Sequence, residues 1–123
     1  MKLRIIFCLL SLLLISCDKQ EKPAAAFYYW KTIFKLTAKE KEALQQNEIR
    51  KIYIRYFDID LHPKTQEPFP LSPIHFENKT ENLEVVPVVY IKNKVMLKNG
   101  IDVEALAKKT FDFIELVNSK NGI

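Results

Sequence analysis

The chain has 123 residues, of which 48% are hydrophobic, so it is sized for one globular domain with an apolar core. Its net charge of +4 falls to +2 without Lys2 and Arg4 of the leader, which argues against the basic footprint of a nucleic-acid-binding protein. Both cysteines, Cys8 and Cys17, lie near the N-terminus, which excludes a disulfide framework or a redox C-x-x-C pair in the rest of the chain. We therefore predict no nucleic-acid partner, no metal site and no other cofactor.

Residues 1–16 have the pattern of a secretory signal peptide. A basic segment, Met1 to Arg4, precedes an apolar run from Ile5 to Ile15 that only Ser11 interrupts. A helix that spans a bilayer needs roughly 20 apolar residues, so this run is too short for a transmembrane anchor. The pattern predicts export of the chain.

The apolar run ends in Leu14-Ile15-Ser16-Cys17, which resembles the lipobox of bacterial lipoproteins. In a lipobox the cysteine thiol receives a diacylglyceryl group, and a small residue before it fits the peptidase that cuts there. We expect a mature chain that begins at the lipidated Cys17 and is held on the membrane by its acyl chains. An ordinary signal peptide with an incidental cysteine and a buried N-terminal helix are the alternatives.

Residues 17–26 are interpreted as the lipidated cysteine and a tether, polar at first and then rich in alanine. Asp18 resembles the inner-membrane retention signal of enteric bacteria, whereas charged residues there direct export to the cell surface in other phyla. The expected location is a bacterial cell membrane, with the outer membrane or surface favoured and the leaflet left open.

Residues 27–123 are predicted to form a single α/β domain. Phe27 to Lys31 has high strand propensity, and a capping box at Thr37 and Glu40 begins a helix that runs to about Gln46. Lys51 to Ile59 has apolar residues on both alternating faces, which is typical of a strand covered on both sides in a parallel sheet.

The second half of the domain is predicted to contain a loop, a strand and a helix. The loop is rich in proline and runs from Pro63 to Pro73, and the strand covers Val85 to Ile91. Asp102 then caps a helix, and Gly122 resembles its left-handed C-cap. Three strands with two helices leave edges uncovered, so we expect a domain cut short and prone to self-association.

Four motifs carry a resemblance over the whole mature domain: Phe27 to Thr32, Lys51 to Asp60, Val85 to Ile91, and the closing Asn121-Gly122-Ile123. They resemble the N-terminal portion of a family of uncharacterised Bacteroidota lipoproteins, whose longer members look like glycoside-hydrolase-type βα barrels. The resemblance implies a partial set of parallel βα units, like the start of a TIM-type barrel. It also implies a truncated relative of a carbohydrate-active protein, with a carbohydrate as candidate ligand.

Asp58 and Asp60 are the candidate catalytic residues, because active sites of βα barrels lie at the C-terminal ends of strands. Asp58, Asp60 and His62 occupy alternate positions along the chain, which places all three on one face if the strand continues through them. The low specificity of this pattern favours the plainer alternative, in which they are solvent-facing residues at the start of a turn. Arg55, on the opposite face, is expected to pair with a carboxylate. We expect no activity from this chain, or else a glycoside-hydrolase-like one.

Tyr28 and Trp30 are the candidate ligand-binding residues, because an aromatic ring can stack on the axial C–H groups of a sugar. The alternative is that the aromatic run from Phe27 to Trp30 belongs to the core.

A thioredoxin-like fold is the alternative architecture, since Val86 to Lys94 followed by a helix resembles the strand, hairpin and helix that end thioredoxin. Without C-x-x-C it would be an envelope binding module with no redox activity. Two features would distinguish the thioredoxin-like fold: a cis peptide bond before Pro87, and antiparallel pairing of Val88–Ile91 with Val95–Leu97.

Overall fold

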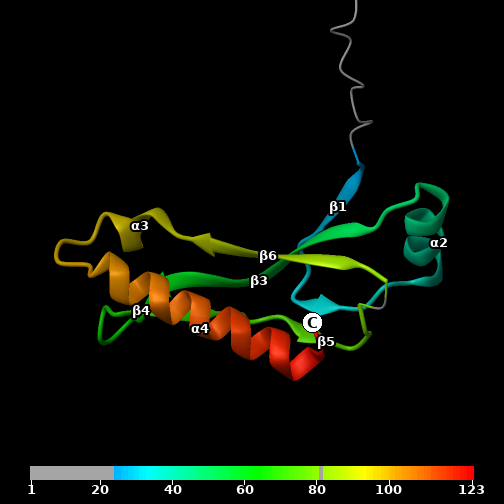
Figure 1. The fold of residues 1–123 in the computed structure, drawn as a ribbon. Coiled ribbons are helices and arrows are strands. Elements are labelled where there is room, and N and C mark those ends of the chain that lie inside the picture. Colours follow the sequence, from blue (N-terminus) through cyan, green and yellow to red (C-terminus); the bar gives the residue numbers. More distant parts are fainter. Residues whose placement is uncertain (1–23, 81) are drawn as a thin grey trace, which may run out of the picture.

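The computed structural model describes residues 24–80 and 82–123, and these form a mixed α/β domain (Figure 1). Its central element is the long strand β3, Lys51–Leu61. Strand β6, Glu84–Ile91, runs parallel to β3 along one edge. The other edge is shared by β1, Ala26–Tyr29, which is parallel to the first half of β3, and β4, Pro68–Leu71, which is antiparallel to its second half. The described sheet is therefore open and of mixed orientation.

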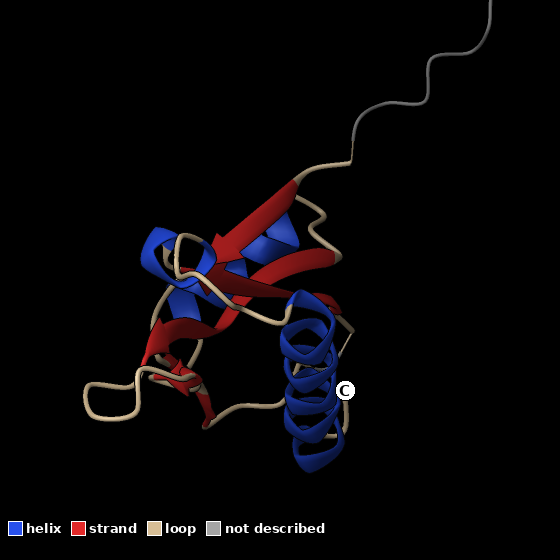
Figure 2. Ribbon diagram, turned by 90° about the vertical axis from the view of Figure 1, so that its left-hand side faces the viewer, coloured by secondary structure: helices blue, strands red, loops and turns tan. Residues whose placement is uncertain are grey.

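The remaining strands form a small second sheet, in which β2, Ile33–Phe34, pairs parallel with β5, His75–Phe76. The described helices are α2, Ala38–Gln46, α3, Asn93–Met96, and α4, Val103–Asn121. Helix α4 lies along one side of the main sheet, and β2 and β5 lie on that side as well (Figures 1 and 2). No helix among those described has the length and apolarity needed to cross a membrane.

The predicted helix ends are confirmed. At α2, the Thr37 side chain accepts the Glu40 backbone N–H, and the Glu40 carboxylate accepts the Thr37 N–H. At α4, Asp102 accepts the N–H of Ala105 at 2.9 Å. Gly122 ends α4 in the left-handed conformation, with φ of 68°. These local signals are why both helices were predictable.

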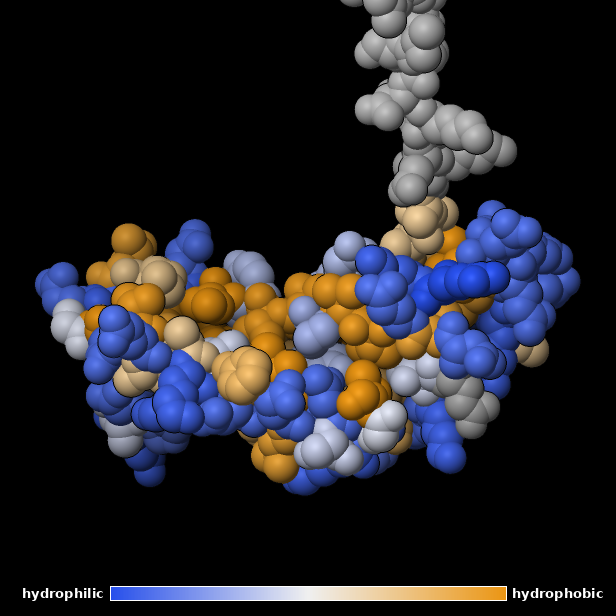
Figure 3. All heavy atoms as spheres, viewed as in Figure 1, coloured by the Kyte–Doolittle hydropathy of each residue, from blue (hydrophilic) through white to orange (hydrophobic). Residues whose placement is uncertain are grey.

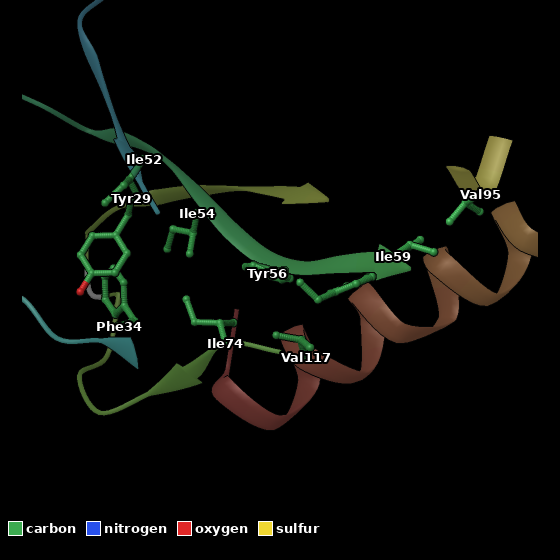
Figure 4. Packing of buried hydrophobic residues seen from close by; sticks show 10 residues of the cluster. Tyr29, Phe34, Ile52, Ile54, Tyr56, Ile59, Ile74, Val95 and Val117 are labelled. Carbon is green, nitrogen blue, oxygen red and sulfur yellow. The ribbon is translucent and has the colours of Figure 1, made fainter. Parts of the chain in front are cut away.

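The core lies between β3, α4 and the small sheet (Figure 4). The ring of Phe57 meets the ring of Phe113 edge to face at 4.8 Å, which joins β3 to α4. Tyr56 adds a second connection, because its hydroxyl donates to the Asn118 side-chain oxygen at 2.7 Å. Burial raises the pKa of Tyr56 to about 12.

Strand β3 contains a bulge, and this corrects the expectation that both of its faces are covered. The register with β6 shifts by one residue between Arg55 and Phe57, so Tyr56 and Phe57 are consecutive and both buried. A bulge of this kind reverses the alternation of side chains. As a result, the apolar residues before and after it point to the same core face, while Tyr53 on the other face is 39% exposed.

The segment predicted as a proline-rich loop, Pro63 to Pro73, contains strand β4, and strand β5 follows directly after it. Strand β4 includes Pro68 and Pro70, which an edge strand tolerates because one of its sides makes no ladder bonds.

The two marks of a thioredoxin-like fold are absent from the described residues. Helix α3 occupies the place expected for the returning strand, and the described peptide bonds include no cis bond. All three predicted strands and both predicted helices are present, but the described sheet does not close into a barrel.

Candidate functional site

Asp58 is held by Arg55 in a bidentate ion pair. Its Oδ1 atom accepts a hydrogen bond from the Arg55 Nε at 2.8 Å, and its Oδ2 atom lies 2.6 Å from the Arg55 Nη2. The expectation that Arg55 pairs with a carboxylate is confirmed, but its placement on the opposite face is wrong, because the bulge turns Asp58 to the Arg55 side. Contact with Asp58 raises the pKa of Arg55. Asp58 is therefore fully engaged by its neighbour in β3.

Asp60 is held by two lysines from the end of β6 and the start of α3. The Nζ atoms of Lys92 and Lys94 each lie 2.6 Å from one of its carboxylate oxygens. The backbone N–H of Leu61 donates to the same carboxylate at 2.7 Å. These contacts, that with Lys92 above all, hold the pKa of Asp60 well below its usual value.

The expectation that Asp60 is solvent-facing at the start of a turn is wrong. Strand β3 continues through it to Leu61, and its residue is only 8% exposed.

His62 lies beyond the end of β3 and belongs to the turn. Its Nδ1 accepts the backbone N–H groups of Lys64 and Thr65 at 3.3 and 3.2 Å. Its ring packs against Phe69 with 5.4 Å between centroids. The loop therefore begins at His62, as the plainer alternative expected.

This arrangement does not suit glycoside hydrolysis. That reaction requires one carboxyl group that stays protonated as the acid and a second that acts as base or nucleophile. Asp58 is engaged by a guanidinium, and the lowered pKa keeps Asp60 ionised. The described residues also include no group of three or more His, Cys, Asp or Glu side chains placed to hold a metal ion. The geometry supports a structural role for both carboxylates.

The aromatic run at the start of the domain divides into buried and exposed residues. Tyr29 belongs to the core, and its hydroxyl donates to the Ile33 carbonyl at 2.7 Å. Tyr28 and Trp30 are 55% and 73% exposed. The core alternative is therefore correct for Tyr29, whereas the two candidate ligand-binding residues keep much of their surface free.

Tyr28 belongs to a wider surface that the sequence reasoning missed. The register places Tyr53 beside Tyr28 in β1 and beside Val86 in β6, and it places Arg55 and Asp58 beside Val88 and Tyr90. Cross-strand neighbours share a face. We call this surface the open face, and its members are Tyr28, Tyr53, Arg55, Asp58, Val86, Val88 and Tyr90. The alternation of Val86, Val88 and Tyr90 was the available signal.

A separate apolar cleft of about 160 Å³ lies on the core side, between α4 and strands β3 and β4. Phe57, Phe69 and Phe113 line it, together with Lys109. It contains none of the candidate site residues.

Cys17 lies outside the described residues. Comparison of the chain with protein-family models, with curated proteins and with solved structures finds no match.

Proposed function

We propose that this chain is a lipid-anchored protein of the bacterial cell envelope, attached to the membrane through Cys17, with the outer membrane or surface as its favoured location. The observation that carries the proposal is the sequence Leu14-Ile15-Ser16-Cys17 at the end of a short apolar run with a basic start. Residues 27–123 act as a binding domain without catalysis of its own. The engagement of Asp58 and Asp60 by cations supports this part of the proposal.

A relationship to βα-barrel proteins of the glycoside-hydrolase type is part of the proposal. It is supported by the three parallel strands of the main sheet. β1, β3 and β6 lie side by side in the sheet in the same order as they occur along the chain, as the strands of a barrel do. The thioredoxin-like alternative has less support, since α3 replaces its returning strand.

The anchor is tested by labelling cells that express the full chain with radioactive palmitate. The Cys17→Ser variant should lose the label and remain uncut, because the acceptor thiol is gone. The matched control is Cys8→Ser, which removes the other cysteine from within the leader and should leave labelling unchanged. Equal labelling of the Cys17→Ser variant and the parent would refute the anchor.

A carbohydrate ligand is the second candidate, and the exposure of Tyr28 and Trp30 beside a buried Tyr29 favours it. Stacking of a sugar on these rings should change the fluorescence of Trp30, the only tryptophan of the chain, during titration with soluble cell-wall oligosaccharides. Tyr28→Ala should weaken binding by about two- to tenfold, the range expected for one aromatic contact. Met96→Ala, an exposed apolar residue on α3, is the control. An unchanged Trp30 signal at saturating sugar would contradict this candidate.

A further inference from the structure

Strand β6 forms a free edge of the main sheet in the described part of the chain. Among the described strands it pairs with β3 alone, and it is eight residues long and almost entirely apolar. Apolar surface runs along it in Figure 3. A long apolar edge with free backbone groups is a template for pairing with another strand.

Two backbone hydrogen bonds fix which groups of β6 point outward. The N–H of Glu84 donates to the Arg50 carbonyl at 2.6 Å, and the N–H of Lys92 donates to the Ile59 carbonyl at 3.0 Å. Backbone groups alternate in direction along a strand, so even-numbered residues of β6 point to β3. The outward residues are Val85, Pro87, Val89 and Ile91. Pro87 is thus in a position where its missing N–H removes no bond to β3.

We propose that β6 pairs antiparallel with β6 of a second copy of this chain, about a two-fold axis at Val88. In this register Val85 is opposite Ile91 of the second copy, and Pro87 is opposite Val89. Each outward N–H group, on Val85, Val89 and Ile91, then has a carbonyl acceptor. The interface is isologous and closes as a dimer.

The charged residues at the two ends of β6 favour antiparallel pairing with a second copy of this chain. Glu84 begins β6 and Lys92 follows its last residue, so the proposed register places Glu84 of each copy opposite Lys92 of the other. A parallel arrangement would place like charges together, which is unfavourable. The Glu84 side chain is 63% exposed beside Lys51, so it has room to reach across the interface. The sequence at the two ends of the strand is therefore self-complementary in the antiparallel direction.

The side chains of the open face also match in this register. Val88 meets Val88 at the axis, and Tyr90 meets Val86 on either side, which are the β-branched and aromatic pairs that stabilise sheets. The dimer would join the two open faces into one continuous surface. Cys17 takes no part in this pairing, so the proposal does not depend on the lipid anchor.

Disulfide formation tests the register. At a non-hydrogen-bonded antiparallel pair the two Cα atoms lie about 4.5 Å apart, which is within the range for a disulfide. The Val88→Cys variant of the full chain, expressed in bacteria and oxidised with copper phenanthroline, should run at twice its mass on a non-reducing gel. Val86→Cys is the matched control on the same face. Its copies would lie roughly 13 Å apart and should give about a tenth of the dimer or less.

The parent chain controls for Cys8 and Cys17 and should give no dimer under the same conditions. Val89→Pro, added to Val88→Cys, removes an outward N–H and should abolish the cross-link, while protease resistance reports whether the chain is still folded. The proposal is overturned if Val88→Cys gives no dimer, if Val86→Cys cross-links equally, or if the cross-link joins a different protein. It is also overturned if a folded Val89→Pro variant cross-links unchanged.

Discussion

At the scale of single residues, Asp60 is the charged residue that the fold buries among those described. An Asp side chain that is only 11% exposed must be paired, because an uncompensated buried charge is strongly destabilising. Lys92 and Lys94 supply the pairing from the segment that leaves β6, so Asp60 joins the end of β3 to the start of α3. This contact fixes the start of α3 against the end of β3.

Asp60→Asn should therefore lower the urea midpoint of unfolding at pH 7. The pKa of Asp60 in the folded state lies below its ordinary 3.8, so the carboxylate's contribution is fully present above that pH. It is lost as the pH falls through the folded-state pKa, and the difference between parent and variant should shrink below pH 3.8.

The control for this prediction is Asp112→Asn, which removes an exposed pair with Lys108 on α4. It should change the free energy of unfolding by no more than about 0.5 kcal/mol, as is typical of surface ion pairs. Equal midpoints for the parent and Asp60→Asn at pH 7 would show that the lysine pairing does not stabilise the fold.

At the scale of elements, those with local signals were predictable and those fixed by distant contacts were not. Residues close together in the sequence determine the caps of α2 and α4 and the apolar runs of β1, β3 and β6. The bulge at Tyr56 depends on a remote segment, because the Tyr56 carbonyl accepts the N–H of Ile74 at 2.7 Å instead of continuing the ladder with β6. Strand β4 was not predicted, because its prolines are typical of a loop, although an edge strand tolerates them.

The same bulge explains what could be predicted of the candidate site. Strict alternation from Arg55 puts Asp58 on the opposite face, and one inserted residue brings the two together. The position of Asp58 and Asp60 near the end of β3 was predictable from the strand itself. Their partners were not, because the lysines that cover Asp60 belong to a segment that pairs with β3 only in the folded chain.

At the scale of the whole molecule, the described elements cover one face of the main sheet and leave the other face open. Helix α4 and the small sheet lie on the core side (Figures 1 and 2). The other side presents Tyr28, Tyr53 and Tyr90 to solvent. Antiparallel sheets commonly have this asymmetry, whereas parallel sheets are usually covered on both faces. The open face is therefore the surface that remains for a ligand or partner.

Neighbouring residues of β3 allow the two faces to be compared directly. Ile54 is fully buried, and Tyr53 beside it is on the open face. Ile54→Thr leaves a cavity and buries a hydroxyl group, so it should lower the free energy of unfolding by roughly 2 to 4 kcal/mol. Tyr53→Thr keeps strand propensity and truncates a residue that is 39% exposed, so it should lower that free energy by about 1 kcal/mol or less. Urea unfolding followed by circular dichroism measures both. Similar losses from the two substitutions would mean that the open face is covered in solution, and the binding role assigned to it would have to be abandoned.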